Sequence, residues 1–442
     1  MFICALLAPL PPRSFSCGGY FFKNIFMRQI KFKKSVYLDH AATTPIDPRV
    51  KKVMAPFESE KFGNPSSLHS HGKQAKEALE NSRNTIAKII GAKPTEIIFT
   101  AGGTESVNLA IFGVAKMNTD RKSDKHGLPH LVASIIEHHC VLHSFSNLVG
   151  EGYATSIVEV DKFGRIDQSR LKASVRPETI LISVMYANNE IGTLQPIAEI
   201  GKWLKALNAE RQKTNLPRIF FHTDACQAAG YVDLNVDKLG VDLMSVNGSK
   251  IYGPKQTGFL YVRTGVPLAP LVHGGGQERG LRSGTENVAG VVGLAKALEL
   301  AQAGRIKENN RLLKLQDYLT TQIIKTIPNV LLNGAGNQKL KVVTSNKYIF
   351  SKLPNNINVT FKKTEGEALM FYLDSYGFSV STSSACSADI TEASHVLLAI
   401  GRTREEAKSS IRFSLGKSTT LIGIKNLMKV LPKLVRDLRK VY

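Results

Sequence analysis

The sequence predicts an α/β fold in which helices cover a mainly parallel sheet, followed by a smaller α+β domain. Between about residue 95 and residue 265, short runs of β-branched and aromatic residues alternate with helical patterns. This alternation is typical of strands joined by crossover helices. After about residue 300 the alternation stops. The chain has 442 residues, 43% of them hydrophobic, which is enough for the cores of two or three domains.

Five runs form the expected sheet, and a long helix at about 67–90 precedes them. The expected strands span residues 96–100, 131–136, 179–185, 219–223 and 258–262. Residues 118–128 are charged and contain glycine, which indicates a loop. Because ligands of such sheets bind beyond the carboxyl ends of the strands, we expect the functional site there.

The smaller domain is expected to end in a basic amphipathic helix that covers it. This helix places apolar residues from Ile424 to Leu438 on one stripe. The expected elements before it are a helix at about 306–326, a strand at 357–361, a helix at 365–375 and a loop of small residues at 381–387. The chain thus divides into a tail (1–35), a segment joining the smaller domain (36–52), a large domain (53–302) and the smaller domain (303–442).

The chain is basic, because 58 Lys and Arg residues face 36 Asp and Glu residues, a net charge of +22. The excess is concentrated before Asp39 and in the last helix, and no RRM, zinc-finger or KH motif accompanies it. No apolar run approaches the roughly 18 residues of a membrane span. We therefore expect neither direct nucleic-acid nor membrane binding. Residues 1–35 are either an organelle transit segment or a disordered tail before a start near Met27, and we favour the tail.

The cysteines indicate a reducing compartment, and we expect the cytoplasm. The five are far apart, odd in number and form no C-x-x-C pair, so neither a disulfide framework nor a zinc site is predicted. They are Cys4, Cys17, Cys140, Cys226 and Cys386.

The pair formed by Asp224 and Lys250 is typical of a pyridoxal phosphate site. Asp224 ends an expected strand, and Lys250 lies later in a glycine-bounded loop. The cofactor needs an anion against its pyridine nitrogen and a lysine for the Schiff base. An aspartate that caps a helix and a surface lysine beside a Gly-Pro turn would give the same pattern.

Two glycine-rich segments offer phosphate donors. Gly103 and Thr104 follow a strand and lead into a helix, so their N–H groups and the Thr104 hydroxyl can meet a phosphate. Plain helix capping is the alternative. Residues 274–285 are too rich in glycine for a core element, and either supply further donors or form a flexible linker.

Four further residues lie where chemistry is expected. His138, after a strand, can stack on a flat ring and transfer protons, or be structural. Asn189 follows another strand and can donate to a phenolate oxygen, or be a turn residue. Cys386 lies among small polar residues that suit a reactive thiol, although an inert one fits equally. Arg412 can bind a carboxylate through two hydrogen bonds, or form a surface ion pair.

Taken together and in this order, these segments resemble the NifS/IscS-like cysteine desulfurases of the class V aminotransferase family. The resemblance runs from Tyr37 to about Arg412. It rests on Tyr37-Leu-Asp-His-Ala-Ala-Thr-Thr-Pro45, Phe62-Gly-Asn-Pro-Ser-Ser67, Thr104-Glu-Ser106, Asn188-Asn-Glu-Ile-Gly192, Lys250-Ile-Tyr-Gly-Pro-Lys255, Arg282-Ser-Gly-Thr285, Glu365-Gly-Glu367 and Ser384-Ala-Cys386. It implies a fold-type-I pyridoxal-phosphate-dependent transferase whose large domain has a mainly parallel, seven-stranded sheet.

The resemblance implies a homodimeric enzyme that converts L-cysteine to L-alanine and leaves the sulfur on Cys386 as a persulfide. Lys250 and His138 are the other implied catalytic residues, and Arg412 and Asn189 the substrate residues. The implied cofactor contacts are Lys250, Gly103, Thr104, His138, Asn189, Asp224, Gln227, Asn247, Gly248, Ser249 and, from the second subunit, Thr285.

The implied sulfur acceptor is an iron–sulfur scaffold protein or a tRNA-thiolation enzyme. No structural metal site is expected, although Cys386 could touch a transient iron–sulfur cluster. A selenocysteine lyase or another class V enzyme remains the nearest alternative. A basic nucleic-acid-binding protein that keeps a degenerate fold is a more distant one.

Two features depart from the family. The family commonly has Ser-Gly-His-Lys where this chain has Asn247-Gly-Ser-Lys250, so an imidazolium near the phosphate is lost and cofactor affinity is open. The chain also ends at Tyr442, without the tail that some members extend toward a scaffold protein, which leaves docking to such a scaffold open.

Overall fold

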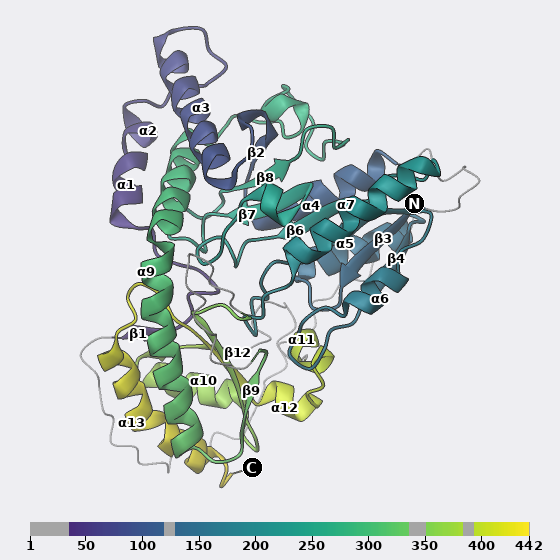
Figure 1. Ribbon diagram of the computed structural model, residues 1–442. Coiled ribbons are helices and arrows are strands. Elements are labelled where there is room, and N and C mark those ends of the chain that lie inside the picture. The colour runs from purple at the N-terminus through teal and green to yellow at the C-terminus, as the bar shows by residue number, and fades with distance from the viewer. Residues whose placement is uncertain (1–34, 119–128, 336–350, 383–392, 442) are drawn as a thin grey trace, which may run out of the picture.

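Figure 1 shows the computed structural model of the chain, which describes residues 35–118, 129–335, 351–382 and 393–441. A seven-stranded sheet forms its centre, in the order β2-β8-β7-β6-β5-β3-β4. Strands β3 to β7 pair in parallel and β8 is antiparallel to both of its neighbours. The strands are β2 (Ile97–Thr100), β3 (His130–Ser134), β4 (Ala154–Val158), β5 (Thr179–Ser183), β6 (Phe220–Asp224), β7 (Leu243–Asn247) and β8 (Gly258–Val262).

The predicted sheet is confirmed, and all five strands expected from the residues are present. Two further strands, β4 and β7, were not among them. Strand β4 is largely open to solvent at the edge of the sheet, so it lacks a buried apolar run. Strand β7 is buried but carries polar residues among its apolar ones.

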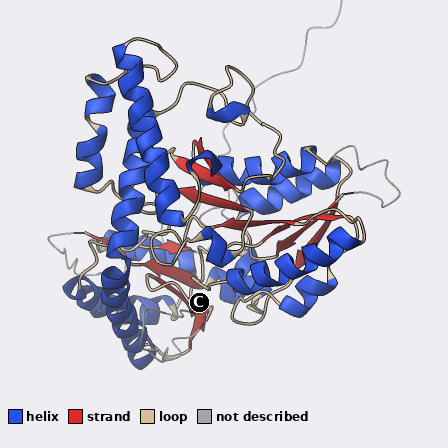
Figure 2. Cartoon of the chain, turned by 45° about the horizontal axis from the view of Figure 1, so that its top comes forward, coloured by secondary structure: helices blue, strands red, loops and turns tan. Residues whose placement is uncertain are grey.

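Helices cover both faces of this sheet (Figure 2). Adjacent strand residues point to opposite faces, so Ile98 and Phe99 belong to different core clusters. Helices α4 and α5 pack on the face of Ile98, and α3 and α7 on the face of Phe99. These helices are α3 (Ser70–Ile90), α4 (Gly103–Lys116), α5 (His139–Gly150) and α7 (Ile197–Lys213), and the shorter α6 (Gln168–Ala173) and α8 (Val236–Leu239) complete this part.

A second sheet of four antiparallel strands has the order β12-β13-β10-β9. Its strands are β9 (Val330–Asn333), β10 (Asn356–Phe361), β12 (Ser381–Thr382) and β13 (Ser410–Ser414). The helices around it are α10 (Gly366–Ser375), α11 (His395–Ala399), α12 (Arg404–Lys408) and α13 (Leu421–Leu438). The expected basic helix is present as α13, and its apolar stripe from Ile424 to Val435 is buried.

The chain's first described strand also belongs to this region. Strand β1 (Val36–Tyr37) pairs in parallel with β11 (Phe378–Ser379). From there the chain passes to α1 (Pro48–Met54) and α2 (Pro56–Ser59), which pack against α9.

Helix α9 (Val288–Thr326) has 39 residues and runs from the seven-stranded sheet to the four-stranded one (Figure 1). Its predicted start near residue 306 was wrong. The first turns contain Gly290 and Gly293, and glycine lowers helix propensity. Both glycines lie at close packing contacts, because a Cβ at Gly293 would lie 2.5 Å from the sulfur of Met54 and one at Gly290 would lie 2.6 Å from a methyl group of Thr257. Within the described ranges, no helix has the length and apolar character of a membrane span.

A buried ion pair fixes α3 to the edge of the seven-stranded sheet. The Arg83 guanidinium donates to both carboxylate oxygens of Glu278 at 2.9 and 2.7 Å, and to the carbonyl of Ile97 at 2.7 Å. Glu278 also accepts the N–H of Phe99 at 2.8 Å. Arg83 and Glu278 are both buried.

We expect Glu278→Gln to lower the free energy of unfolding by about 3 kcal/mol, because it removes the buried carboxylate that pairs with Arg83 and leaves only the half-exposed carboxylate of Glu80 beside this guanidinium. Denaturant titration measures this loss. The matched control is Glu210→Gln, because Glu210 pairs with Lys213 while both side chains are more than two-thirds exposed. The control should change the free energy by less than about 1 kcal/mol. Equal effects of the two changes would contradict the prediction.

Candidate active site

Most of the predicted site residues meet in one cavity of about 160 Å³. The cavity lies at the carboxyl ends of β3, β5, β6 and β7, where Arg412 from β13 of the second sheet also reaches it. The residues that line it are Ala41, Gly103, Thr104, His138, Cys140, Met185, Ala187, Asn189, Asp224, Cys226, Gln227, Asn247, Lys250 and Arg412.

Asp224 is the last residue of β6 and is buried. Its Oδ1 accepts the N–H of Cys226 at 2.9 Å, which fixes the carboxylate at the cavity wall. The carboxylate favours protonation of its neighbours. Burial, and then the charge of Asp224, raise the pKa of the Cys140 and Cys226 thiols. These two thiols are therefore neutral at physiological pH and are poor nucleophiles.

The loop that carries Lys250 is fixed by residues from the N-terminal segment. The Thr44 hydroxyl donates to the carbonyl of Ser249 at 2.9 Å and accepts the N–H of Tyr252 at 2.8 Å. The Lys250 ammonium donates to the carbonyl of Ala42. Since Tyr252 has a φ of 64°, this hydrogen bonding holds the loop in a conformation that L-residues rarely adopt.

A second cavity of about 620 Å³ adjoins the first and shares Gly103, Thr104 and Asn247 with it. Ser249 also lines it, whereas Gly248 lines neither cavity. Gly103 is the first residue of α4, so the helix presents free N–H groups there. A Cβ at Gly103 would lie 2.6 Å from the Cys226 sulfur, so only glycine fits this approach.

His138 caps the N-terminus of α5 with its ring. Its Nδ1 accepts the N–H of Cys140 at 3.2 Å and lies 3.1 Å from the Cys140 sulfur. Because Nδ1 accepts, the neutral ring carries its proton on Nε2. Burial lowers the pKa of His138, while the charge of Asp224 acts in the opposite direction.

Arg412 is almost completely buried, with 2% of its side chain exposed. Its guanidinium donates to the carbonyl of Asn189 at 3.1 Å and pairs with the Asp39 carboxylate at 2.8 Å. The Nε of Arg412 has no hydrogen-bond partner among the described residues. The alternative of a surface ion pair is therefore wrong, since this guanidinium faces the cavity from within the protein.

Two predicted residues that the structure describes, Gly248 and Thr285, line neither cavity. Cys386 lies outside the residues that the structure describes. Thr285 is exposed. It is expected to contribute to the cofactor site of a second subunit, and the structure contains a single chain. Gln227 does line the cavity, and its side-chain amide donates to the carbonyl of Ala41 at 3.0 Å.

Sequence reasoning missed three residues of the site: Asp39, Cys140 and Cys226. Asp39 belongs to the motif Tyr37-Leu-Asp-His-Ala-Ala-Thr-Thr-Pro45, so its membership of a site was visible although its partner was not. Cys140 lies two residues after His138 and Cys226 two residues after Asp224. Their closeness to predicted residues was the available signal.

The described residues fit pyridoxal phosphate. A helix N-terminus beside Gly103 suits the phosphate, and the Asp224 carboxylate suits a protonated pyridine nitrogen. Lys250 supplies an amine in the same cavity, and the ring of His138 lines its wall. The guanidinium of Arg412, which lines the same cavity, suits the carboxylate of an amino acid.

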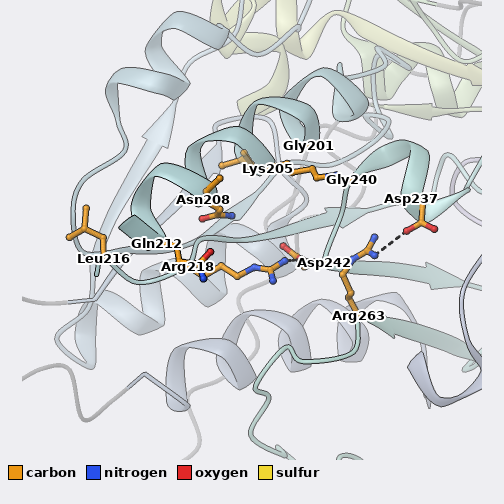
Figure 3. A pocket seen from close by; sticks show the side chains of 12 residues that line it. Gly201, Lys205, Asn208, Gln212, Leu216, Arg218, Asp237, Gly240, Asp242 and Arg263 are labelled. Carbon is orange, nitrogen blue, oxygen red and sulfur yellow. Dashed lines mark hydrogen bonds and ion pairs between the residues drawn. The ribbon is translucent and has the colours of Figure 1, made fainter. Parts of the chain in front are cut away.

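A larger cavity of about 800 Å³ lies at the opposite edge of the sheet, near the amino ends of β6 and β7 (Figure 3). Its arginines are already paired, Arg218 with Asp242 at 2.5 Å and Arg263 with Asp237 at 3.0 Å. None of the predicted site residues lines it. We therefore place the active site in the smaller cavity.

Comparisons with known proteins identify the family of the chain. The family model for class-V aminotransferases matches residues 36–427. The cysteine desulfurase IscS of Dictyoglomus turgidum is 46% identical over 410 residues, which are 92% of this chain and 96% of that protein. The cysteine desulfurase of Mus musculus is 43% identical over 390 residues, 88% of this chain and 78% of that protein. A solved NifS-like protein has a TM-score of 0.80 at 35% identity, covering 91% of this chain and all of its own.

We expect Gly103→Ala to weaken pyridoxal phosphate binding by about tenfold or more, because the added methyl displaces the Cys226 sulfur and Asn247 from the phosphate side of the cavity. Absorbance titration of the apoprotein with pyridoxal phosphate measures the affinity. Gly304→Ala is the control, since a Cβ there meets nothing within 4 Å. Unchanged affinity in Gly103→Ala would show that phosphate does not bind at this helix N-terminus.

Proposed function

The chain belongs to the class-V aminotransferase family and is a pyridoxal-phosphate-dependent cysteine desulfurase, and we propose that its sulfur passes through Cys386 to an acceptor protein. The observation that carries the assignment of residues is a single cavity. It brings Lys250, Asp224 and Arg412 together from separate elements of two sheets.

The cofactor is held by groups at both ends of this cavity. Gly103, Thr104, Asn247 and Ser249 would hold its phosphate, Asp224 would pair with its protonated ring nitrogen, and Lys250 would supply the amine for the covalent link. When bound, pyridoxal phosphate supplies an electron sink for the substrate carbon that loses its proton. Asn189 and Gln227 would donate to its phenolic oxygen, and His138 would stack on its ring.

The protein's own groups then bind the substrate and move its protons. Arg412 binds the carboxylate of L-cysteine through its guanidinium, which orients the α-carbon toward Lys250. The Lys250 amine removes the α-proton. Because the neutral His138 carries its proton on Nε2, it can donate that proton within the cavity and recover it later.

Sulfur transfer balances without an added oxidant. The thiolate of Cys386 attacks the sulfur of the substrate, an S–S bond forms and the C–S bond breaks. The electron pair of the C–S bond stays with carbon, which takes up a proton and leaves as L-alanine. Cys386 is left as a persulfide, whose outer sulfur is at the oxidation level that an acceptor thiol needs.

The partners follow from this chemistry. The acceptor is an iron–sulfur scaffold protein or a tRNA-thiolation enzyme, each of which takes up persulfide sulfur. A homodimer supplies Thr285 from the second subunit to the phosphate. The cytoplasm suits the free thiols of Cys140 and Cys226.

The first test separates the two catalytic residues. With L-cysteine and a reductant, the wild-type protein should produce sulfide and alanine in equal amounts. Lys250→Ala should lose the visible absorbance of the Schiff base and all activity, whereas Cys386→Ala should keep the absorbance and lose sulfide release by at least about a hundredfold. Undiminished sulfide release in Cys386→Ala would contradict its role. Faster alanine release from selenocysteine, unaffected by Cys386→Ala, would instead indicate a selenocysteine lyase.

A hybrid dimer tests where Thr285 acts. Lys250→Ala and Thr285→Ala subunits are co-expressed with different tags, and the mixed dimer is purified. If Thr285 serves the partner's site, the hybrid has one wild-type site and binds one pyridoxal phosphate with wild-type affinity. If Thr285 serves its own subunit, no wild-type site forms. Only the weaker affinity of the Thr285→Ala homodimer would then be measured.

A further inference from the structure

We propose that Glu190 takes up a proton when the substrate carboxylate binds to Arg412, and that it thereby makes substrate affinity depend on pH. Nothing in the assignment of the site uses Glu190, which follows Asn189 in the chain. The inference rests on the proposed substrate role of Arg412 and adds a residue that sets the charge Arg412 presents.

Glu190 has a fixed position at the junction of the two sheets. Its side chain is buried, and its Oε2 accepts a hydrogen bond from the Ser394 hydroxyl at 2.5 Å. Ser394 in turn accepts the N–H of Leu397 at 3.2 Å and caps α11. The carbonyl of Glu190 accepts the side-chain amide of Asn358 at 3.1 Å.

Arg412 and Glu190 approach each other through one peptide unit. The Arg412 guanidinium donates to the carbonyl of Asn189, which belongs to the peptide unit that joins Asn189 to Glu190. On the neighbouring strand, Asn358 pairs in register with Arg412 and binds the Glu190 carbonyl. The positive charge of Arg412 therefore acts on the Glu190 carboxyl.

The carboxylates of Asp39 and Glu190 make binding of a third one, that of the substrate, unfavourable beside Arg412. Arg412 already pairs with Asp39 at 2.8 Å, so an ionised Glu190 gives this buried group two negative charges against one positive. The groups facing Glu190 from the packed elements are Arg412 on β13, the uncharged Ser394 at α11 and the uncharged Asn358 on β10. A substrate carboxylate at Arg412 adds a third negative charge, and protonation of Glu190 removes one.

Glu190 is poised for this change near neutral pH. Burial raises its pKa to about 7, against the lowering effects of the Ser394 hydrogen bond and of Arg412. Below that pH Glu190 is neutral, so it does not repel the substrate carboxylate at Arg412. As pH rises through about 7, Glu190 ionises in the free enzyme, so substrate affinity falls until the pKa of the bound state is passed.

The experiment compares the wild-type holoenzyme with Glu190→Gln, whose side-chain oxygen can still accept from Ser394. KM for L-cysteine is measured between about pH 6 and pH 9, a range that spans the neutral and ionised forms. The thiol and amino group of cysteine titrate alike with both proteins, so the KM ratio isolates Glu190. We expect the wild-type KM to rise about tenfold relative to the variant, as for a pKa change of about one unit. A ratio that is constant with pH overturns the proposal.

Two further variants separate charge from structure. Ser394→Ala keeps the carboxylate and removes the hydrogen bond that lowers its pKa, so the rise in KM should remain and shift to higher pH. Glu405→Gln removes an exposed carboxylate on α12 and should leave the wild-type profile unchanged. A Ser394→Ala profile without any rise would contradict a role for the Glu190 charge.

A direct readout does not depend on turnover. Infrared difference spectra are recorded when L-alanine, which carries the carboxylate but no thiol, is added to the holoenzyme at about pH 8, above the free-enzyme pKa. A carboxylic acid C=O band should appear in the wild type and be absent from Glu190→Gln. Binding of alanine without this band overturns the inference. A wild-type protein that forms no alanine from cysteine overturns the proposed function, and the alanine spectra still decide the role of Glu190.

Discussion

The hydrogen bonds made by residues 38–44 are the constraint on which the rest of the site depends. This short segment lies between the two sheets, and its polar groups are satisfied by both. Leu38 bonds to Ser379 and Ser414 on the four-stranded side, and Thr44 bonds to Ser249 on the side of the lysine loop. A buried backbone group without a partner costs free energy, so neither sheet can shift along this segment without loss. The segment thereby sets the place of Lys250 relative to Arg412.

Electrostatics then divides the cavity into regions of different charge. Burial, and then the Asp224 carboxylate, raise the pKa of the thiols of Cys140 and Cys226, so these two cysteines of the cavity are poor nucleophiles. Burial keeps His138 neutral, and its contact with the Cys140 N–H fixes which nitrogen carries the proton. At the other end, Arg412 is compensated by Asp39 and acted on by Glu190. The protonation state and charge of each group in the cavity are therefore set by its environment more than by its residue type.

Sequence reasoning predicted those parts of the molecule that local pattern determines. The carboxyl ends of parallel strands meet at one edge, so His138, Asn189 and Asp224 could be placed together from their positions after strands. The buried ion pair between Arg412 and Asp39 could not be predicted in this way, because only the tertiary fold brings the two residues together. The start of α9 was missed for a related reason. Its glycines lie close to Asn287, Thr257 and Met54, and they oppose the local helical preference.

The 39 residues of α9 span roughly 58 Å at about 1.5 Å per residue. Such a helix resists bending, and with the segment of residues 38–44 it joins the two sheets at separate points. The proposed Schiff-base lysine, Lys250, and the proposed carboxylate-binding arginine, Arg412, therefore lie at a set distance, and neither role involves the side chain of the amino acid. Selection among amino acids must then be made by the group that reacts with the side chain. On these proposed roles, an amino acid without a thiol would occupy the site and leave without losing its side chain.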